Sequence, residues 1–133
     1  MKRLNKLYWL KKEIEQIEMQ IKELTVLSAT AMSGMPSGGS VSSPVEKFYD
    51  RLEKLRNKLQ AKLNEYITEK ERIEEYIENI EDAEVRVIAR LRFIENMDFQ
   101  TLGNEMFMDR TTAYRKLKKY LEKDGKQSPL AVL

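Results

Sequence analysis

The chain of 133 residues contains no cysteine and no histidine. Without cysteine, neither a disulfide nor a thiolate metal site can form. Without histidine, the commonest general base and metal ligand is missing, which excludes Ser-His and Cys-His catalysis and histidine-ligated zinc. Carboxylates remain, but on helices this rich in charge they are most often solvated or paired. We therefore expect no enzyme, no metal and no cofactor.

Long apolar runs are also missing, and glycine and proline are scarce, at five and three residues. No segment reaches the roughly 18 consecutive apolar residues of a membrane span, and no apolar run of a secretory signal follows the basic N-terminus. We expect no membrane partner and a cytoplasmic location. Charged residues make up 35% of the chain, a composition typical of long exposed helices. The expected fold class is all-α.

Two long helices are predicted in the first 81 residues. Residues 4 to 28 carry apolar residues at alternating spacings of three and four, the pattern of a coiled-coil seam. Residues 28 to 44 are rich in Gly, Ser and Pro and predict a flexible loop. A second helix is expected after Pro44, to about Asn79, so that residues 1–81 form an antiparallel hairpin. The second helix is longer, so a second copy of the chain or the C-terminal domain must cover its last apolar positions.

The second helix divides into two blocks of opposite charge. Six basic residues oppose two acidic ones from Lys47 to Lys62, and eight acidic residues oppose two basic ones from Glu65 to Asp82. The acidic block would repel DNA and could attract a basic protein surface. A solvated face that also caps the next helix is the simpler interpretation.

Residues 82–124 predict a three-helix domain, followed by a flexible tail at 125–133. A scaffold helix covers about Asp82 to Glu95, and Asp98 and Asp109 are each placed to cap one of two further helices. The short helix after Asp98, a break and a second helix have the spacing of a helix-turn-helix. Gly103 falls where the two helices would cross. One buried seam is expected, formed by Phe99, Leu102, Met106, Met108, Ala113, Leu117 and Leu121.

The last helix carries the charge that indicates a partner. From Asp109 to Lys123, six basic residues oppose two acidic ones. A helix in the major groove brings its N-terminal side chains to base edges and its cations to phosphates. The candidates for base contact are Arg110, Thr111, Thr112 and Arg115. The candidates for phosphate contact are Tyr114, Lys118 and Lys119. A basic face that is merely solvated is the plainer alternative.

Residues 82 to 121 resemble the fourth region of bacterial sigma factors, a helix-turn-helix that reads an upstream promoter element. The matching segments are Arg92-Phe93-Ile94, Asp98-Phe99-Gln100-Thr101-Leu102-Gly103, Met108-Asp109 and Thr111-Thr112-Ala113-Tyr114-Arg115. The resemblance adds Gln100 and Thr101 to the expected DNA contacts. Phe107 stands where the turn usually has glycine, which predicts either a positive φ on a bulky residue or a different turn. Lys116 stands at a normally apolar position, for which Leu117 could substitute.

The layout of the whole chain is similar to that of small sigma-like proteins encoded by phages and prophages of Gram-positive bacteria, which are transcriptional regulators, often of late phage genes. The resemblance implies a sequence-specific transcriptional regulator in the cytoplasm of the host cell. Its expected partners are double-stranded DNA and RNA polymerase, and a homodimer would form through the N-terminal helices. Two alternatives stay open: a small-terminase-like DNA-packaging subunit and a helical adaptor between proteins.

Overall fold

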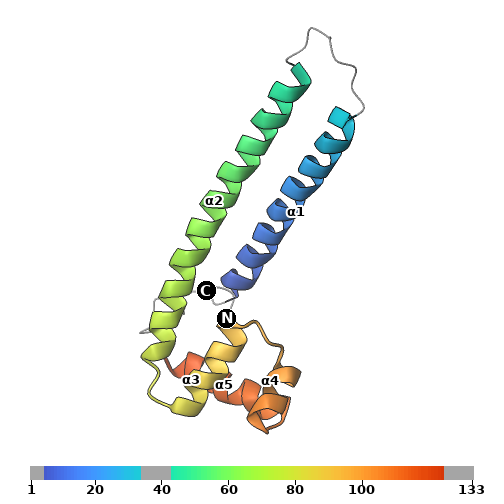
Figure 1. Cartoon of the computed structure of the whole chain (residues 1–133). Helices are drawn as coiled ribbons and strands as arrows, with labels where there is room; N and C mark the ends of the chain where they lie inside the picture. Colours follow the sequence, from blue (N-terminus) through green and yellow to red (C-terminus); the bar gives the residue numbers. More distant parts are fainter. Residues whose placement is uncertain (1–4, 34–42, 125–133) are drawn as a thin grey trace. The chain divides into compact units, whose positions relative to one another are not determined.

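The computed structural model describes residues 5–33 and 43–124, and over these residues every regular element is helical (Figure 1). The predicted all-α class is therefore confirmed. The elements are α1 (Lys6–Ser33), α2 (Ser43–Glu78), α3 (Ala83–Ala89), η1 (Arg90–Ile94), α4 (Phe99–Met106) and α5 (Arg110–Asp124). In the described parts of the chain, no helix is both long and apolar enough to cross a membrane.

The chain divides into two compact units, and α1 and α2 each contribute to both. One unit is Leu10–Glu65, called here the hairpin unit. The other combines Met1–Trp9 with Tyr66–Leu133 and is called the C-terminal unit. This division differs from the boundary expected between residues 81 and 82. The reason is that the last turns of α2 bury their side chains with α3, α4 and α5.

The hairpin unit follows the predicted coiled-coil seam. Ile14 and Ile17 of α1 are buried, as is Leu52 of α2. An ion pair joins the two helices, with Lys62 Nζ 2.8 Å from Glu13 Oε2. The hydrogen bond with Glu13 is the main cause of a raised pKa of Lys62, and the charge of Glu65 adds to it. The seam and this pair are consistent with the chain reversal predicted between the helices.

The predicted loop at residues 28–44 is too long at both ends, which corrects the sequence interpretation. Helix α1 continues to Ser33 and α2 begins at Ser43, while residues 34–42 lie outside the described residues. Residues 28–33 contain no glycine or proline to stop a helix, and alanine there favours one. Pro44 falls in the first turn of α2, where its missing N–H leaves no bond unmade.

The core of the C-terminal unit buries the apolar residues near the end of α2, the longer of the two long helices. Ile73, Ile77 and Ile80 are buried in one cluster with residues of the helix-turn-helix. That cluster also contains Leu7, Val85, Ile88, Ala89, Phe93, Leu102, Ala113 and Leu117. The sequence left two possibilities for burying these residues, a second copy of the chain or the C-terminal domain. The structure shows them buried by the C-terminal domain.

The predicted scaffold helix at 82–95 is present, but its second half is wound more loosely. Asp82 caps α3 by accepting hydrogen bonds from the N–H groups of Glu84 and Val85. Residues Arg90–Ile94 then form a π-helical turn, in which the Glu95 N–H bonds to the Arg90 carbonyl at 3.1 Å. Arg92 closes this end by donating to the Met97 carbonyl at 2.9 Å. The wide turn was not predicted, because its signal is geometric rather than a residue pattern.

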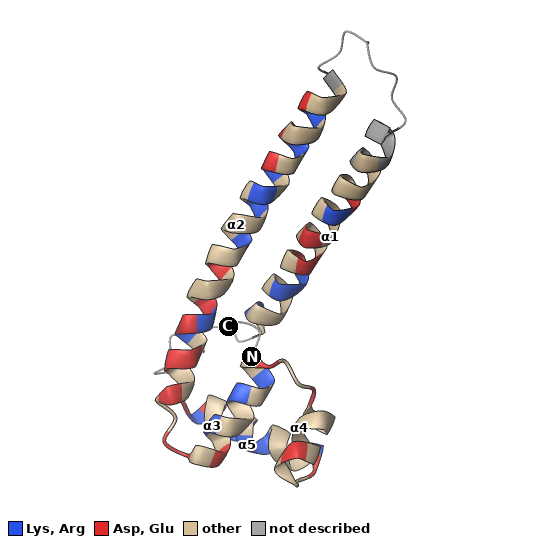
Figure 2. Cartoon of the chain, in the orientation of Figure 1, with Lys and Arg blue, Asp and Glu red and all other residues tan. Residues whose placement is uncertain are grey.

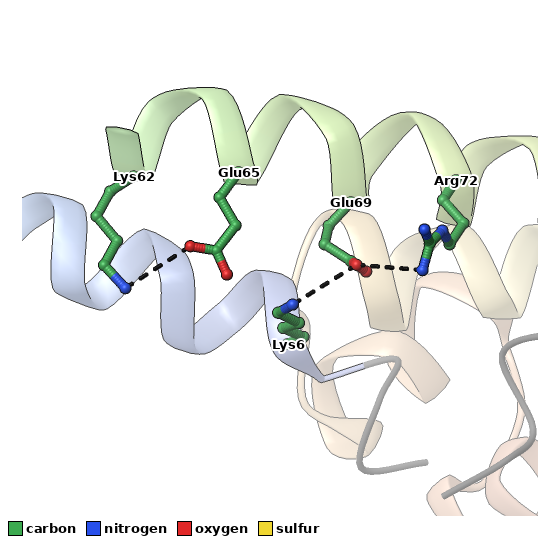
Figure 3. A network of polar contacts seen from close by, with 5 residues as sticks. All are labelled: Lys6, Lys62, Glu65, Glu69 and Arg72. Atoms are coloured by element: carbon green, nitrogen blue, oxygen red, sulfur yellow. Dashed lines mark hydrogen bonds and ion pairs between the residues drawn. The ribbon is translucent and has the colours of Figure 1, made fainter. Parts of the chain in front are cut away.

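A buried carboxylate joins the start of α1 to α2 within the C-terminal unit (Figure 3). The Glu69 side chain is 7% exposed, and its Oε1 lies 3.6 Å from Lys6 Nζ and 3.5 Å from Arg72 Nη1. A buried charge is tolerated when opposite charges flank it. Glu69 therefore ties residues 5–9 to this unit in addition to the apolar contact of Leu7.

Candidate nucleic-acid interface

Helix α4 begins where the sequence predicts, at an aspartate cap. Asp98 Oδ1 accepts a hydrogen bond from the Thr101 N–H at 2.7 Å. This backbone bond is the largest cause of a lowered pKa of Asp98, followed by a bond from the Thr101 side chain. The cap fixes the first turn of α4, on which Gln100 and Thr101 are both exposed.

The turn between α4 and α5 places a bulky residue in the left-handed region. Phe107 has φ 55° and ψ 43°, and the Met108 N–H bonds to the Gly103 carbonyl at 2.9 Å. Of the two turns that the sequence left open at Phe107, the structure has the one with positive φ. Its side chain is 97% exposed. The fold therefore accommodates Phe107 without gaining any buried contact from it.

Gly103 allows α4 to approach the turn closely, as predicted from its place at the crossing. A Cβ on Gly103 would lie 2.7 Å from the Met108 carbonyl oxygen and 3.1 Å from the Arg110 nitrogen. Both neighbours are backbone atoms, which cannot rotate away. Glycine is thus required for the distance between α4 and the start of α5.

Helix α5 starts at Arg110, with Asp109 in the capping position. The sequence predicted a cap by the Asp109 carboxylate, but the bond observed is to its backbone carbonyl. The Asp109 carbonyl accepts the Ala113 N–H at 3.0 Å. Among the described residues, the Asp109 carboxylate makes no hydrogen bond to the first N–H groups of the helix. The prediction of a side-chain cap is therefore correct for Asp98 and wrong for Asp109. The first turn of α5 follows directly on the turn closed by the Met108 N–H and the Gly103 carbonyl.

The predicted seam between the two helices is confirmed. Leu102, Ala113 and Leu117 are fully buried. The partly buried members pack against the same cluster and are Phe99, Met106, Met108 and Leu121. Leu117 fills the apolar position next to Lys116, which is exposed. One side of α5 is thereby fixed inward and the opposite side is left outward.

The outward side of α5 carries most of the predicted contact residues. Arg115 lies two positions from Leu117, about 200° around the helix, and so faces away from the core. Arg110, Arg115, Lys118 and Lys119 are exposed, as is Thr111, whereas Thr112 is half-buried. Arg110 and Arg115 make no ion pair or hydrogen bond through their side chains with any part of the chain that the structure describes. Their guanidinium groups have no role in holding the fold.

Tyr114 is held in place by rings and cations. Its ring meets Phe99 of α4 edge-on, with centroids 5.3 Å apart at 85°. The Arg92 guanidinium lies 4.9 Å from the Phe99 ring centre, and Lys118 Nζ lies 5.7 Å from that of Tyr114. Such contacts favour one orientation of each group. The role of Arg92 was missed, and only the spacing of four between Tyr114 and Lys118 is readable from the sequence.

The remaining side of α5 faces acidic residues, so its cations are divided between two environments. Lys116 pairs with Glu84 of α3. Lys116, Lys119 and Lys123 line a cleft of about 730 Å³ that Glu81, Asp82 and Glu84 also line. Acidic residues just before α3 and in its first turn thus offset part of the basic charge of α5. Lys119, predicted to contact phosphate, lies at this cleft and not with Arg110.

The end of α5 is tied back to α2 at the same cleft. The Tyr76 hydroxyl donates to Asp124 Oδ2 at 2.8 Å. Burial raises the pKa of the neighbouring Tyr120, and the charges of Asp124 and Glu81 add to the effect. These contacts fix the C-terminal turn of α5 and leave its N-terminal half outward.

The fold and this surface define an all-helical protein whose C-terminal unit is a helix-turn-helix with a basic, outward-facing second helix. The chain belongs to a family described as proteins of unknown function (DUF1492), whose sequence pattern matches residues 25–123. Among curated proteins and among solved structures, none gives a significant match. The match covers most of the hairpin unit, all of α3 and α4, and α5 as far as Lys123, and its description assigns no activity.

The turn supplies a first prediction. Replacing Phe107 with glycine should stabilise the C-terminal unit by about 0.5–1 kcal/mol, because glycine adopts a positive φ without the steric cost of a Cβ. The ring is exposed, so no buried contact is lost with it. The midpoint of urea unfolding measures the gain. Phe107→Ala is the matched control, since it removes the ring but keeps the Cβ, and it should bring no gain. Equal stabilisation by both variants would show that exposure of the ring, and not φ, carries the cost.

Proposed function

We propose that this chain is a sequence-specific double-stranded-DNA-binding regulator of transcription that reads DNA with α5. The observation that carries the proposal is the outward, unpaired state of Arg110 and Arg115 at the N-terminal half of α5, beside exposed Thr111. The major groove of B-DNA admits an α-helix, and arginine is the residue that most often reads guanine there. A helix held by a short turn against α3 and α4 is a rigid support for such contacts.

The proposed contacts follow the two faces of α5. Arg110, Thr111, Thr112 and Arg115 would meet base edges. The residues proposed to contact phosphates are Tyr114, Lys118 and Lys119 of α5 with Gln100 and Thr101 of α4. Tyr114 and Lys118 are supported by the ring contact with Phe99, which holds the pair beside the reading residues. Lys119 is the least supported, because it shares a cleft with acidic residues.

The wider role rests on the resemblance to the fourth region of sigma factors. A phage- or prophage-encoded regulator in the cytoplasm of a bacterial host would contact RNA polymerase as well as DNA. We also propose a homodimer through the hairpin unit, since two linked reading helices bind far more tightly than one. Met19 and Val26, seven residues apart on α1, support this as exposed apolar side chains on one face. A large closed ring in sedimentation experiments would favour the DNA-packaging role instead.

The proposal is tested by selecting bound duplexes from a random pool and measuring affinities for the selected site and for scrambled sites. We expect Arg115→Ala to lower discrimination between them by about 5- to 150-fold, the effect of losing one bidentate base contact of about 1–3 kcal/mol. Lys118→Ala is the control. It should weaken binding to selected and scrambled duplexes alike, because a phosphate contact carries no sequence information.

Two results would contradict the proposal. One is the absence of duplex binding by the unaltered chain at low salt. The other is an Arg115→Ala variant that discriminates between the selected and scrambled duplexes as well as the unaltered chain does. In that case α5 would not be the reading helix.

A further inference from the structure

A second basic surface lies on α2 in the hairpin unit, apart from the helix-turn-helix. Lys47, Arg51, Lys54 and Lys58 follow one another at spacings of four, three and four residues. Residues three and four apart lie on the same face of a helix, so the four cations form one stripe. All four are exposed. In Figure 2 the half of α2 that begins at Ser43 carries most of the blue segments of this helix, and the other half most of the red.

Within the described residues, no ion pair neutralises the charge of this stripe. None of the four side chains makes an ion pair with another residue in the described segments. This differs from the next basic residue of α2, Lys62, which lies 2.8 Å from Glu13 and 3.7 Å from Glu65. Four like charges on one face of a helix repel one another. The stripe therefore slightly destabilises the isolated helix.

The shape of the stripe fits a straight polyanion. Its first and last residues are 11 positions apart on an α-helix, which is about 16 Å at 1.5 Å per residue. Double-stranded DNA presents one negative charge per about 1.7 Å of its axis, so this length faces several phosphates. Glu46 and Glu53, acidic residues of the same turns, lie about 110–130° around the helix from the middle of the stripe. Asp50 lies at the edge of the stripe, three residues after Lys47 and four before Lys54. A duplex can therefore run along the side of the stripe that faces away from Asp50.

A membrane surface fits the stripe less well. Basic helices that bind bilayers insert an apolar face beside the charges. Leu52 of α2 is buried in this unit, and Leu55 and Leu59 are half-buried. The exposed apolar residues Val45 and Tyr49 lie about 150–170° around the helix from the stripe. No apolar face remains for insertion alongside the stripe. The chemistry that matches is a backbone of phosphodiesters.

We infer that Lys47, Arg51, Lys54 and Lys58 form a second contact surface for the phosphate backbone of double-stranded DNA, independent of α5. This inference rests on the proposed function for the choice of DNA as the polyanion. The stripe adds affinity for any sequence and carries no discrimination, because it contacts phosphates alone.

The test compares the salt dependence of binding for two charge-matched variants of the full chain. The stripe variant combines Lys47→Gln, Arg51→Gln, Lys54→Gln and Lys58→Gln. The control variant removes four cations of the same unit that lie off the stripe: Lys11→Gln, Lys12→Gln, Lys22→Gln and Arg56→Gln. Both lose the same net charge, and circular dichroism at each salt concentration verifies that both keep their helices. The probe is a random-sequence duplex followed by fluorescence anisotropy.

For the stripe variant we expect the slope of log Kobs against log salt to become shallower by about 2–4, since each phosphate contact contributes about 0.9. Discrimination between selected and scrambled duplexes should not change. The control variant should shift the slope by less than about 1. A stripe variant with the slope of the unaltered chain, or a control variant with an equal loss, would overturn the inference. A second series of measurements replaces the duplex with polyglutamate. If the stripe variant loses polyglutamate binding while its duplex slope equals that of the unaltered chain, the inference is also overturned and the stripe is assigned to an acidic protein.

The stripe and the reading helix fail separately in these measurements. Stripe-dependent binding without any effect of Arg115→Ala on discrimination would contradict sequence reading by α5 and leave the stripe as a DNA surface. If discrimination depends on Arg115 but the stripe variant has the salt slope of the unaltered chain, α5 remains the reading helix and the stripe is not a DNA surface. An unaltered chain that binds no duplex at low salt would remove both.

Discussion

Replacing Ile77 with alanine is expected to lower the free energy of unfolding of the C-terminal unit by about 2–5 kcal/mol. Ile77 is fully buried one residue before α2 ends, in the cluster that contains Val85, Phe93 and Leu102. Removing three carbon atoms there leaves a cavity among side chains that can close it only in part. Urea unfolding measures the loss, and hydrogen exchange of α4 and α5 shows whether it reaches the helix-turn-helix.

The matched control for this prediction lies ten residues earlier on the same helix. Ile67 is 51% exposed, so Ile67→Ala removes the same atoms from a site already largely in water. Its effect should stay within about 0.5 kcal/mol. Similar losses for both variants would show that the end of α2 does not belong to the C-terminal core. Unchanged hydrogen-exchange protection of α4 and α5 in Ile77→Ala would also show that the end of α2 does not belong to the C-terminal core.

Gly103→Ala is the second substitution with a large expected effect. Alanine normally gains about 1 kcal/mol over glycine inside a helix. Here its Cβ would lie 2.7 Å from the Met108 carbonyl oxygen, a backbone atom held by the turn. Forcing α4 and the turn apart costs about 1–3 kcal/mol, as overpacking usually does. We therefore expect a net loss of stability and, on the proposed function, weaker binding to duplex DNA because the start of α5 moves.

Unfolding in urea and duplex affinity are measured on the same samples of Gly103→Ala. Glu105→Ala is the control, because Glu105 is exposed on the same short helix. That variant should leave both stability and affinity close to those of the unaltered chain. A Gly103→Ala protein more stable than the unaltered chain would mean that the close approach between α4 and the turn is absent in solution.

The helical layout could be predicted because it follows from local rules. The apolar spacing from Leu7 to Leu24 predicts α1, and Asp98 predicts the start of α4. The buried seam of the helix-turn-helix was predicted in full, because one helix can bury only one face. Gly103 was assigned to the helix crossing, because only a small residue fits where two helices approach closely. These inferences require no knowledge of distant contacts.

The parts that the sequence did not reveal depend on contacts between distant residues. The loop limits were wrong because residues 28–44 were treated as one Gly-, Ser- and Pro-rich segment, although every glycine and proline in it lies after Ser33. The salt bridge from Lys116 to Glu84 joins residues 32 positions apart. No local pattern says that α5 lies against α3 and the acidic residues just before it, so the division of its cations could not be foreseen. The orienting role of Arg92 was hidden for the same reason.

The side chains of Arg110 and Arg115 contribute nothing to the folding of the described chain, while Ala113 and Leu117 between and beside them are indispensable to it. If α5 reads DNA as proposed, stability and recognition are assigned to different residues of a single helix. On the proposed function, members of this lineage could acquire new target sites through one or two codon changes without first needing a compensating mutation. A combinatorial library at positions 110, 111 and 115 would explore that freedom directly.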